Sequence, residues 1–536
     1  MLLLPLASHI GRIAVVLVVA IAGAQCVAAT GERALQVTHF GINTLQLGAS
    51  YDLRGSAQKR LSNLQARSLA SGDVDGDGFP DLVSGYSTDS GGVITLHRGN
   101  REAWAPSTPE SLALVAAGGF PAGFESVATE FAVPVAPDFM VSGDFNGDGR
   151  ADIVFAQRGD RNVYFLAGQR RGFAAAMQIK LEGGVDALAS GRIDSRDGFP
   201  KLVAAVSSAQ GASLLTFTQG MNSPATPRAL AIGKLSVDST GDIVLLSAGR
   251  VHIVYGTDAV AASSAAAAME TLSTSFAVRS LTLGEFIWDR TGATQIALLA
   301  DDGAIHVAAR ADIDTRPFTV DEVSAKRLEQ HSASGAVNKR GKAAASAWQF
   351  VPVAASRVSP SGLGAGAAPK LLRARLSNLV GDDILVIDAL KQTVEILTDD
   401  GSASKRYRVS GSVSASLPPV AALSLQTSAF VLPSLVVLGQ GAAAPSVAPP
   451  VPLAVFTVTK TADTNDGVCN ADCSLREAIS AANAVGGANT VSVPAGTYTL
   501  TIANTGGVNE DDNATGDLDI NSNVTLVGAG SANTII

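Results

Sequence analysis

Short apolar runs, each followed by a polar turn and a second apolar run, recur along most of the chain. The first pair occupies residues 82–86 and 93–97, and the second occupies residues 153–157 and 163–166. Runs of about 4–8 apolar residues between Gly, Asn and Asp clusters are typical of strands in β-hairpins. The pattern therefore predicts a chain built from repeated hairpins.

The same pattern recurs five more times towards the C-terminus, the last copy being faint. These copies occupy residues 202–206 with 213–217, 243–247 with 251–255, 296–300 with 304–307, 384–388 with 393–397, and 435–439. Repetition of one supersecondary unit predicts a repeat architecture. Seven such units fit the four-stranded blades of a β-propeller, in which radial closure protects the sheet edges. We therefore expect an all-β fold with a seven-bladed propeller over residues 30–440.

Two longer gaps interrupt the repeat. Residues 332–370 are rich in Ala, Ser and Gly and locally basic. Long segments of this kind are uncommon inside compact domains, so we expect a surface insertion here. Residues 98–140, between the first two units, leave room for extra strands or a capping loop.

Two Asp-rich segments precede the first two hairpins, at residues 72–81 and 143–152, and both read D-x-[DN]-G-D-G-x-x-D. Calcium takes about 6–8 oxygen ligands, and alternating Asp or Asn in a tight turn can point several oxygens at one centre. We expect one calcium ion in each segment. The candidate ligands are Asp73, Asp75, Asp77, Asp81 and the carbonyl of Phe79 in the first, and Asp144, Asn146, Asp148, Asp152 and the carbonyl of Arg150 in the second.

Two alternatives to this calcium assignment are disfavoured by the residues themselves. An EF-hand needs a Glu at its twelfth position, where these segments hold Ser84 and Phe155, and strand patterns follow instead of a helix. The other alternative is an Asp/Gly-rich turn without an ion. It is disfavoured because several carboxylates within nine residues repel one another unless a cation is present.

The pattern Gly-Asp-x-[Asp/Asn]-Gly-Asp-Gly-x-x-Asp-[Leu/Ile]-Val resembles FG-GAP, or VCBS-type, repeats of integrin-α-like propellers. The resemblance implies calcium loops that rigidify the blades, and it transfers only to the two intact copies. In the third unit Arg192 and Lys201 replace the terminal acids, so no ion is expected there.

The composition agrees with an exported β-rich protein, and it argues against one class of partner, nucleic acid. The chain is 46% hydrophobic and 16% charged, with a formal net charge of -9. No basic patch with interleaved aromatic residues is evident, so we expect no nucleic-acid partner. The integrin-recognition tripeptide Arg158-Gly159-Asp160 also occurs, but it lies where a hairpin needs Gly and Asp for its turn, and a turn is the preferred interpretation.

Residues 1–29 carry a weakly positive start, a short apolar run and a small-residue stretch ending at Ala29. This order predicts a cleaved secretory signal peptide. An uncleaved anchor is the alternative, but the strictly apolar run is about ten residues and a spanning helix needs roughly 20. We expect a secreted or cell-surface bacterial protein with no membrane span after cleavage.

An Ala/Pro-rich segment at residues 441–453 predicts a linker to a second region, 454–536. Ser474 and Glu477 form a capping box that starts a helix, and strand patterns follow at 490–493, 497–502 and 524–527. Cys469 and Cys473 predict a local disulfide in an oxidising compartment, because two further zinc ligands are lacking nearby.

The segment from Cys473 to Ile479 resembles the CSLREA domain, which opens right-handed parallel β-helices in bacterial surface proteins. The resemblance implies a short β-helix start with a capping helix. Since the sequence ends at Ile536 in mid-pattern, two alternatives stay open. The region is either part of a longer β-helix or a remnant that leans on the propeller.

No catalytic constellation is evident, so we expect no enzyme activity. The favoured function is a calcium-binding adhesion or interaction module for an extracellular protein or glycan. One alternative is a carbohydrate-active β-helix protein, of the polysaccharide lyase or hydrolase kind, with the propeller as an accessory domain. That alternative rests on fold analogy alone. A purely structural spacer is a third interpretation.

Overall fold

The computed structural model describes most of the chain from residue 64 onward. The described residues are 36–39, 51–53, 64–116, 119–193, 199–216, 220–223, 227–236, 241–256, 269–287, 289–290, 292–311, 313–314, 316, 348–357, 369–377, 381–399, 407–428, 433–449, 455–485, 489–504, 513–520, 524–530 and 532–536. The predicted signal peptide, 1–29, lies outside them.

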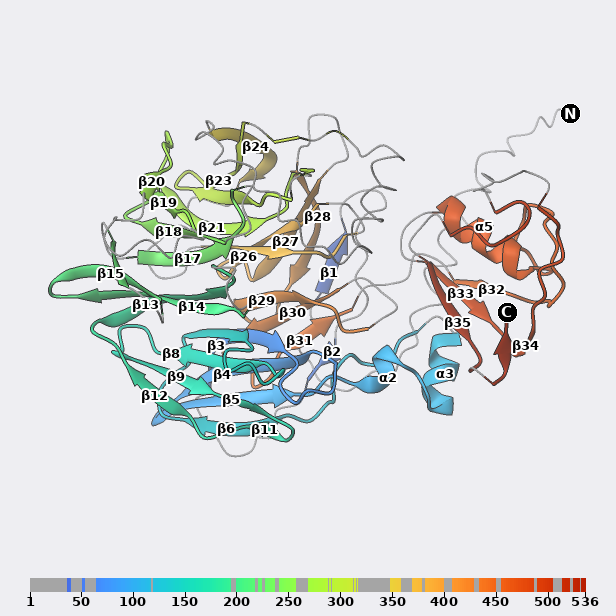
Figure 1. The fold of residues 1–536 in the computed structure, drawn as a ribbon, viewed down its shortest axis with the longest axis horizontal. Helices are drawn as coiled ribbons and strands as arrows, with labels where there is room; N and C mark the ends of the chain where they lie inside the picture. Colours follow the sequence, from blue (N-terminus) through green and yellow to red (C-terminus); the bar gives the residue numbers. More distant parts are fainter. Residues whose placement is uncertain are drawn as a thin grey trace, which may run out of the picture.

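Seven antiparallel sheets form a seven-bladed propeller, which confirms the predicted all-β architecture (Figure 1). Blade one contains β3 Gln65–Gly72, β4 Asp81–Thr88, β5 Gly91–His97 and β6 Thr129–Val133. Blade two contains β7 Phe139–Gly143, β8 Asp152–Ala156, β9 Asn162–Leu166 and β12 Met177–Lys180. Blade three contains β13 Gly184–Gly191, β14 Lys201–Ser208, β15 Gly211–Thr216 and β16 Gly220–Ser223. A small hairpin, β10 Gly168–Gln169 with β11 Gly172–Phe173, lies within blade two.

The remaining blades repeat the same order. Blade four contains β17 Pro227–Gly233, β18 Asp242–Ser247, β19 Arg250–Val254 and β20 Met269–Thr271, and blade five contains β21 Val278–Gly284, β22 Gln295–Ala300, β23 Ala304–Arg310 and β24 Trp348–Arg357. Blade six contains β25 Lys370–Ala374, β26 Asp383–Asp388, β27 Thr393–Asp399 and β28 Tyr407–Ser414. Blade seven contains β29 Pro419–Leu425, β30 Ser434–Gly439 and β31 Ser446–Ala448. The six predicted hairpins coincide with the second and third strands of a blade, and the single run predicted at 435–439 coincides with the second strand of blade seven, within a few residues at each end.

Two N-terminal strands close the ring. β2, Tyr51–Asp52, pairs with β31 as the fourth strand of blade seven, and β1, Gln36–His39, pairs with β28 as a fifth strand of blade six. The last blade is therefore built from both ends of the propeller segment, so that opening the ring requires breaking a sheet rather than a loop.

The core consists of apolar clusters between neighbouring blades. Between blades one and two, Val83 and Ile94 pack against Ile153 and Phe155. Between blades one and seven, Leu82 packs with Val436 and Val447. The second strands are buried over most of their length because both of their faces meet another blade. This explains why these strands are continuous apolar runs in the sequence.

Two sequence expectations within the propeller need correction, and a third is met with an addition. The predicted linker, 441–453, contains β31, whose Val447 is fully buried, so the propeller extends beyond residue 440. The predicted insertion, 332–370, contains β24, the outer strand of blade five. Pairing with a neighbouring strand decides both cases, and an Ala-rich composition gives no sign of it. Residues 98–140 hold β6 and the start of β7, but also two helices, α2 Arg101–Trp104 and α3 Pro109–Ala116.

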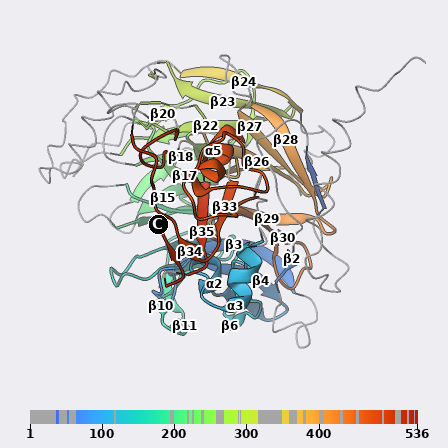
Figure 2. The same ribbon diagram turned by 90° about the vertical axis from the view of Figure 1, so that its right-hand side faces the viewer.

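The C-terminal region contains a three-stranded parallel sheet of β32 Val455–Thr457, β33 Asn489–Val493 and β35 Val524–Gly528, together with α5 Leu475–Val485 (Figure 2). A second parallel pair joins β34 Gly496–Thr497 to β36 Thr534–Ile535. Cys469 and Cys473 form a disulfide. A parallel arrangement is what a β-helix start requires, but a continued β-helix and membership of the CSLREA family remain predictions.

The capping box forms as the sequence predicts. The Ser474 N–H donates to the Glu477 carboxylate at 2.7 Å, and the Glu477 N–H donates to Ser474 Oγ at 3.1 Å. The strand expected at 497–502 is wrong beyond Thr497. There the N–H groups of Thr501 and Ile502 donate to the carboxylate of Asp463 rather than to a strand.

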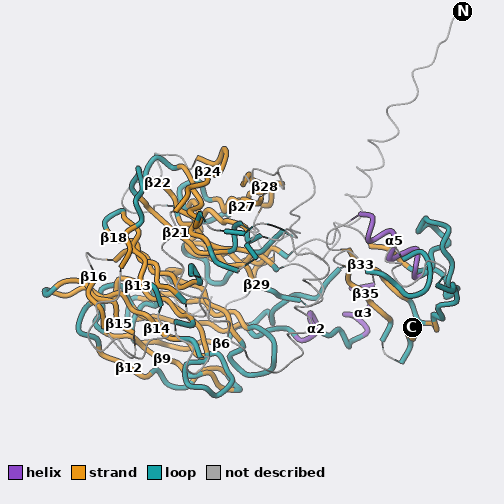
Figure 3. The backbone as a smooth tube through the Cα atoms, turned by 45° about the horizontal axis from the view of Figure 1, so that its top comes forward, coloured by secondary structure: helices purple, strands orange, loops and turns teal. Residues whose placement is uncertain are grey.

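The Arg158-Gly159-Asp160 segment forms the turn between β8 and β9, as expected. Gly159 has a φ of +77°, and the Asp160 N–H donates to the Gln157 carbonyl at 3.1 Å. Helices are few among the described residues (Figure 3), and none of those helices is long and apolar enough to cross a membrane.

Candidate metal sites

The first Asp-rich loop joins the end of β3 to the start of β4. The Asp73 carboxylate accepts the N–H groups of Gly76, Asp77 and Gly78 at 2.8, 3.1 and 2.9 Å, which folds the loop around this side chain. Gly76 and Gly78 have φ of +76° and +91°, which residues with a Cβ rarely adopt. The glycines of the motif are therefore needed for the turn itself.

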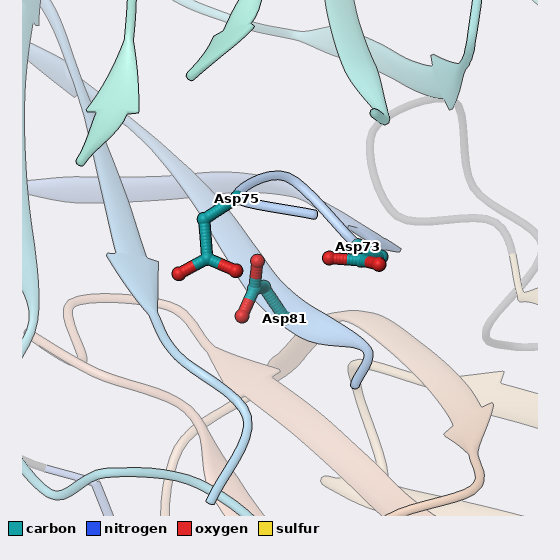
Figure 4. A group of neighbouring side chains, drawn as sticks. All are labelled: Asp73, Asp75 and Asp81. Carbon is teal, nitrogen blue, oxygen red and sulfur yellow. The ribbon is translucent and has the colours of Figure 1, made fainter. Parts of the chain in front are cut away.

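Three carboxylates of this loop converge (Figure 4). Asp73, Asp75 and Asp81 each place one oxygen within 4.8 Å of the others. Calcium–oxygen distances are about 2.3–2.6 Å, so oxygens up to about 5 Å apart can share one ion. Asp77 stays outside this group and accepts the Phe79 N–H at 2.9 Å.

Burial and like charge make this cluster electrostatically costly on its own. Asp81 is fully buried, and desolvation raises its pKa to about 7, with a further contribution from the charges of Asp75 and Asp77. Hydrogen bonds from the Val74 and Gly99 N–H groups, both 2.9 Å, oppose that shift. Desolvation also raises the pKa of Asp75, although Arg98 lies 3.5 Å from its carboxylate. A cation in the loop would relieve this repulsion.

The second loop repeats the backbone arrangement but not the carboxylate cluster. Asp144 accepts the N–H groups of Gly147, Asp148 and Gly149 at 2.7, 3.1 and 3.0 Å. The amide nitrogen of Asn146 donates to Asp148 and to Asp152, both at 3.3 Å. An amide donor therefore lies between the acids where a cation would otherwise sit. Rotation of the Asn146 amide by half a turn would present its oxygen there instead.

The two loops are joined to each other. The Ala151 N–H donates to the Asp73 carbonyl at 2.7 Å, and a Cβ built on Gly76 would lie 3.3 Å from the Arg150 side chain. Phe199, in the same motif position of the third unit, covers Gly147 in the same way, at 3.4 Å from such a Cβ. Each of the two loops is thus covered by a side chain from the next unit.

A structural role of the last motif acid was not foreseen from the sequence. The first residue of the second strand is a buried acid in four blades: Asp81, Asp152, Asp242 and Asp383. Asp242 accepts the N–H groups of Leu235 and Ser236 at 2.8 and 2.9 Å, as Asp81 and Asp152 do in the predicted metal loops. This carboxylate therefore fixes the loop backbone even in a blade for which no ion is predicted. An acid directly before an apolar run was the signal available in the sequence.

The two other predicted calcium ligands are backbone carbonyl groups, and the structure fixes their positions but not their role. Phe79 and Arg150 occupy the expected loop positions, and ligation by their carbonyl groups stays a prediction. In the third unit, residues 194–198 lie outside the described residues.

The fold and these loops together define a seven-bladed propeller with an FG-GAP-type loop. The family model described as FG-GAP repeat matches residues 66–96, which span β3, the first Asp-rich loop, β4 and most of β5. This match confirms the resemblance for blade one and suggests an integrin-like interaction module.

Comparison with other proteins adds little beyond this repeat. No curated protein matches the chain significantly. A chain in a crystal structure of BBS1N in complex with ARL6DN, soaked with lead, is 11% identical and has a TM-score of 0.42. That match covers 77% of this chain and 98% of the other.

Proposed function

We propose that this protein is a secreted or cell-surface interaction module whose first two propeller blades each bind a calcium ion, and that it has no catalytic activity. The observation that carries the proposal is the convergence of Asp73, Asp75 and Asp81 in a loop preorganised by backbone hydrogen bonds. Hard carboxylate oxygens in this number favour calcium over softer transition metals.

The ion would brace the loops rather than take part in a reaction. Asp73, Asp75 and Asp81, joined by the predicted ligand Asp77, would hold the first ion, and Asp144, Asp148 and Asp152, with Asn146 after rotation of its amide, would hold the second. The Ala151 N–H of the second loop donates a hydrogen bond to the Asp73 carbonyl of the first. An ion that orders one loop would therefore also help to order the other. Recognition of a partner is then left to other surfaces of the propeller.

Calcium should stabilise the folded chain measurably. An ion that binds only the folded state at 100 times its Kd adds about 2.7 kcal/mol per site. We expect thermal unfolding followed by circular dichroism to show a Tm several degrees higher in calcium than in chelator. Asp75→Asn combined with Asp148→Asn should remove most of that difference.

The matched control is Asp89→Asn combined with Asp301→Asn, which removes the same charge from exposed turns outside the loops. This control should keep the full calcium response. Equal melting curves in calcium and chelator for the wild type would reject calcium binding. Release of reducing ends or unsaturated products from a polysaccharide would reject the non-enzymatic role.

The two sites should differ in affinity. The first loop offers one more carboxylate than the second, where the neutral Asn146 replaces Asp75, and calcium affinity rises with the charge of the ligand set. Isothermal titration calorimetry should resolve a tighter and a weaker site. Asn146→Asp should tighten the weaker site, and a single class of equal sites in the wild type would contradict the assignment.

A further inference from the structure

The innermost strands of five blades carry a β-bulge at the same register, near the end of the strand opposite the Asp-rich loops. In each, one residue is left out of the pairing with the second strand. These residues are Arg67, Asp186, Arg228, Arg279 and Val420. Bulges redirect side chains and are frequent beside functional sites. Because the bulge recurs at the same register, it marks the end of the propeller opposite the Asp-rich loops as a candidate functional face.

The seven innermost strands contact one another in turn and close around the central channel. The bulges precede the loop-bearing ends of these strands, so they surround the channel mouth on the face away from the Asp-rich loops. In the two blades without a bulge, Asp138 directly precedes β7 at the equivalent register, whereas Lys370 begins β25 one residue beyond it. Six of the seven blades therefore carry a charged residue in this ring, at the bulge register or one residue beyond it.

Positive charge predominates in that ring. Arg67, Arg228, Arg279 and Lys370 are all exposed. Arg158, from the β8–β9 turn, adds a fifth cation, with its guanidinium 4.4 Å from the centre of the Phe139 ring and 2.9 Å from the Asp186 carbonyl.

The two acids of the ring are already engaged. Asp138 lies 3.6 Å from Arg67 and accepts the Arg158 N–H at 3.0 Å, and Asp186 accepts the hydroxyl of Ser207. The second-to-third-strand turns also carry acids, at Asp89, Asp160, Asp301 and Asp302. Asp160 shares its turn with Arg158 and therefore belongs to the mouth with it. The five cations still outnumber the acids Asp138, Asp160 and Asp186 there.

Two of the cations face each other across the channel. Arg158 belongs to blade two and Lys370 to blade six, three blades apart in a seven-bladed ring, which is the largest separation possible. The Lys370 ammonium donates to the Val420 carbonyl at 3.2 Å. An anion bound between Lys370 and Arg158 would relieve the repulsion between these two like charges.

We propose that this mouth, formed by Arg67, Arg158, Arg228, Arg279 and Lys370, is the recognition site of the propeller and binds an anionic polysaccharide through its carboxylate or sulfate groups. The inference rests on the proposed interaction function and names the class of partner. Arginine guanidinium groups form bidentate hydrogen bonds with such oxyanions. Because the chain as a whole is negative, with a net charge of -9, attraction of an anionic ligand depends on local groups of cations such as this mouth.

A single-stranded nucleic acid is the competing polyanion. Binding of that kind relies on aromatic side chains on which bases stack. Phe139 is covered by Arg158, and Phe199, the one aromatic among the exposed large apolar side chains of the described residues, lies in the third motif unit at the other end of the propeller. The mouth therefore offers charge without a stacking platform, which favours the polysaccharide.

The test measures binding of the full chain to fluorescein-labelled polygalacturonate, dextran sulfate, neutral dextran and oligo-dT by fluorescence anisotropy over a series of salt concentrations. Arg158→Gln combined with Lys370→Gln should weaken binding of the acidic polysaccharide at least tenfold and flatten its salt dependence. Arg228→Gln combined with Arg279→Gln provides a second pair at exposed positions. Arg170→Gln combined with Arg171→Gln, in the β10–β11 turn, is the control of equal charge and should change affinity less than twofold.

The two anionic polysaccharides distinguish carboxylate from sulfate recognition, and preferential binding of either supports the proposal. Equal or tighter binding of oligo-dT, an equal loss in the control pair, or unchanged affinity in both mouth pairs with wild-type melting curves would overturn it. The experiments can distinguish an error in this binding site from an error in the proposed function. Calcium-dependent binding of another partner, unaffected by the mouth variants, would leave the interaction module in place and remove only this site.

Discussion

Replacing Arg476 by alanine is expected to destabilise the C-terminal region by about 3–5 kcal/mol, the usual cost of breaking a buried ion pair. Arg476 is fully buried, its Nε lies 2.9 Å from the Asp463 carboxylate, and its terminal nitrogens donate to the Gly516 and Asp517 carbonyls at 2.7 and 2.8 Å. Alanine would leave a buried carboxylate and two carbonyl groups without this donor.

Hydrogen exchange of the α5 and β33 amides is the measurement of choice, because global unfolding would mix this region with the propeller. Asp472→Ala is the control within the same region. The Asp472 carboxylate is largely exposed and lies 3.0 Å from Lys460, so its loss should change the protection of these amides little. Similar protection in Arg476→Ala and in the wild type would show that the buried pair is not required.

Replacing Asp383 by alanine is expected to destabilise the propeller by about 3–5 kcal/mol, since each buried donor left unsatisfied costs about 1–3 kcal/mol. Its carboxylate accepts the N–H groups of Leu376 and Ser377 at 2.6 and 2.8 Å, and the Ser377 hydroxyl at 2.7 Å. Asp383→Asn keeps an acceptor oxygen of the same size and should cost much less. Thermal unfolding of both variants, with Arg408→Ala at an exposed position of the same blade as a control, measures the difference.

Asp383 also gives the sign of a pH effect. Desolvation raises the pKa of Asp383 from 3.8 to about 6. The folded state therefore holds this proton more tightly than the unfolded chain, and stability decreases as pH rises through about 6. Asp383→Asn should remove this part of the pH dependence. A steeper decrease in the Asn variant than in the wild type would contradict a raised pKa.

The sequence alone determined the repeat and the loops. Continuous apolar runs such as residues 82–86 predict buried strands correctly, because the second strand of each blade meets another blade on both faces. The D-x-[DN]-G-D-G-x-x-D pattern also predicts its own turn, since the Asp73 side chain and the backbone that it holds are only a few residues apart. Local interactions of this kind are present in the sequence. The capping box of Ser474 and Glu477 is another.

Only the tertiary structure decided those features that depend on strand pairing and on packing between distant residues. The strand β31 looked like a linker because an Ala/Pro-rich segment shows no periodicity, and only its pairing with β30 and β2 makes it a strand. Asp242 and Asp383 precede apolar runs in units without a complete Asp-rich motif, yet burial makes them the groups that hold their loops. The charged mouth is equally absent from the sequence pattern. Arg158 and Lys370 are far apart along the chain, and closure of the ring brings them to one channel.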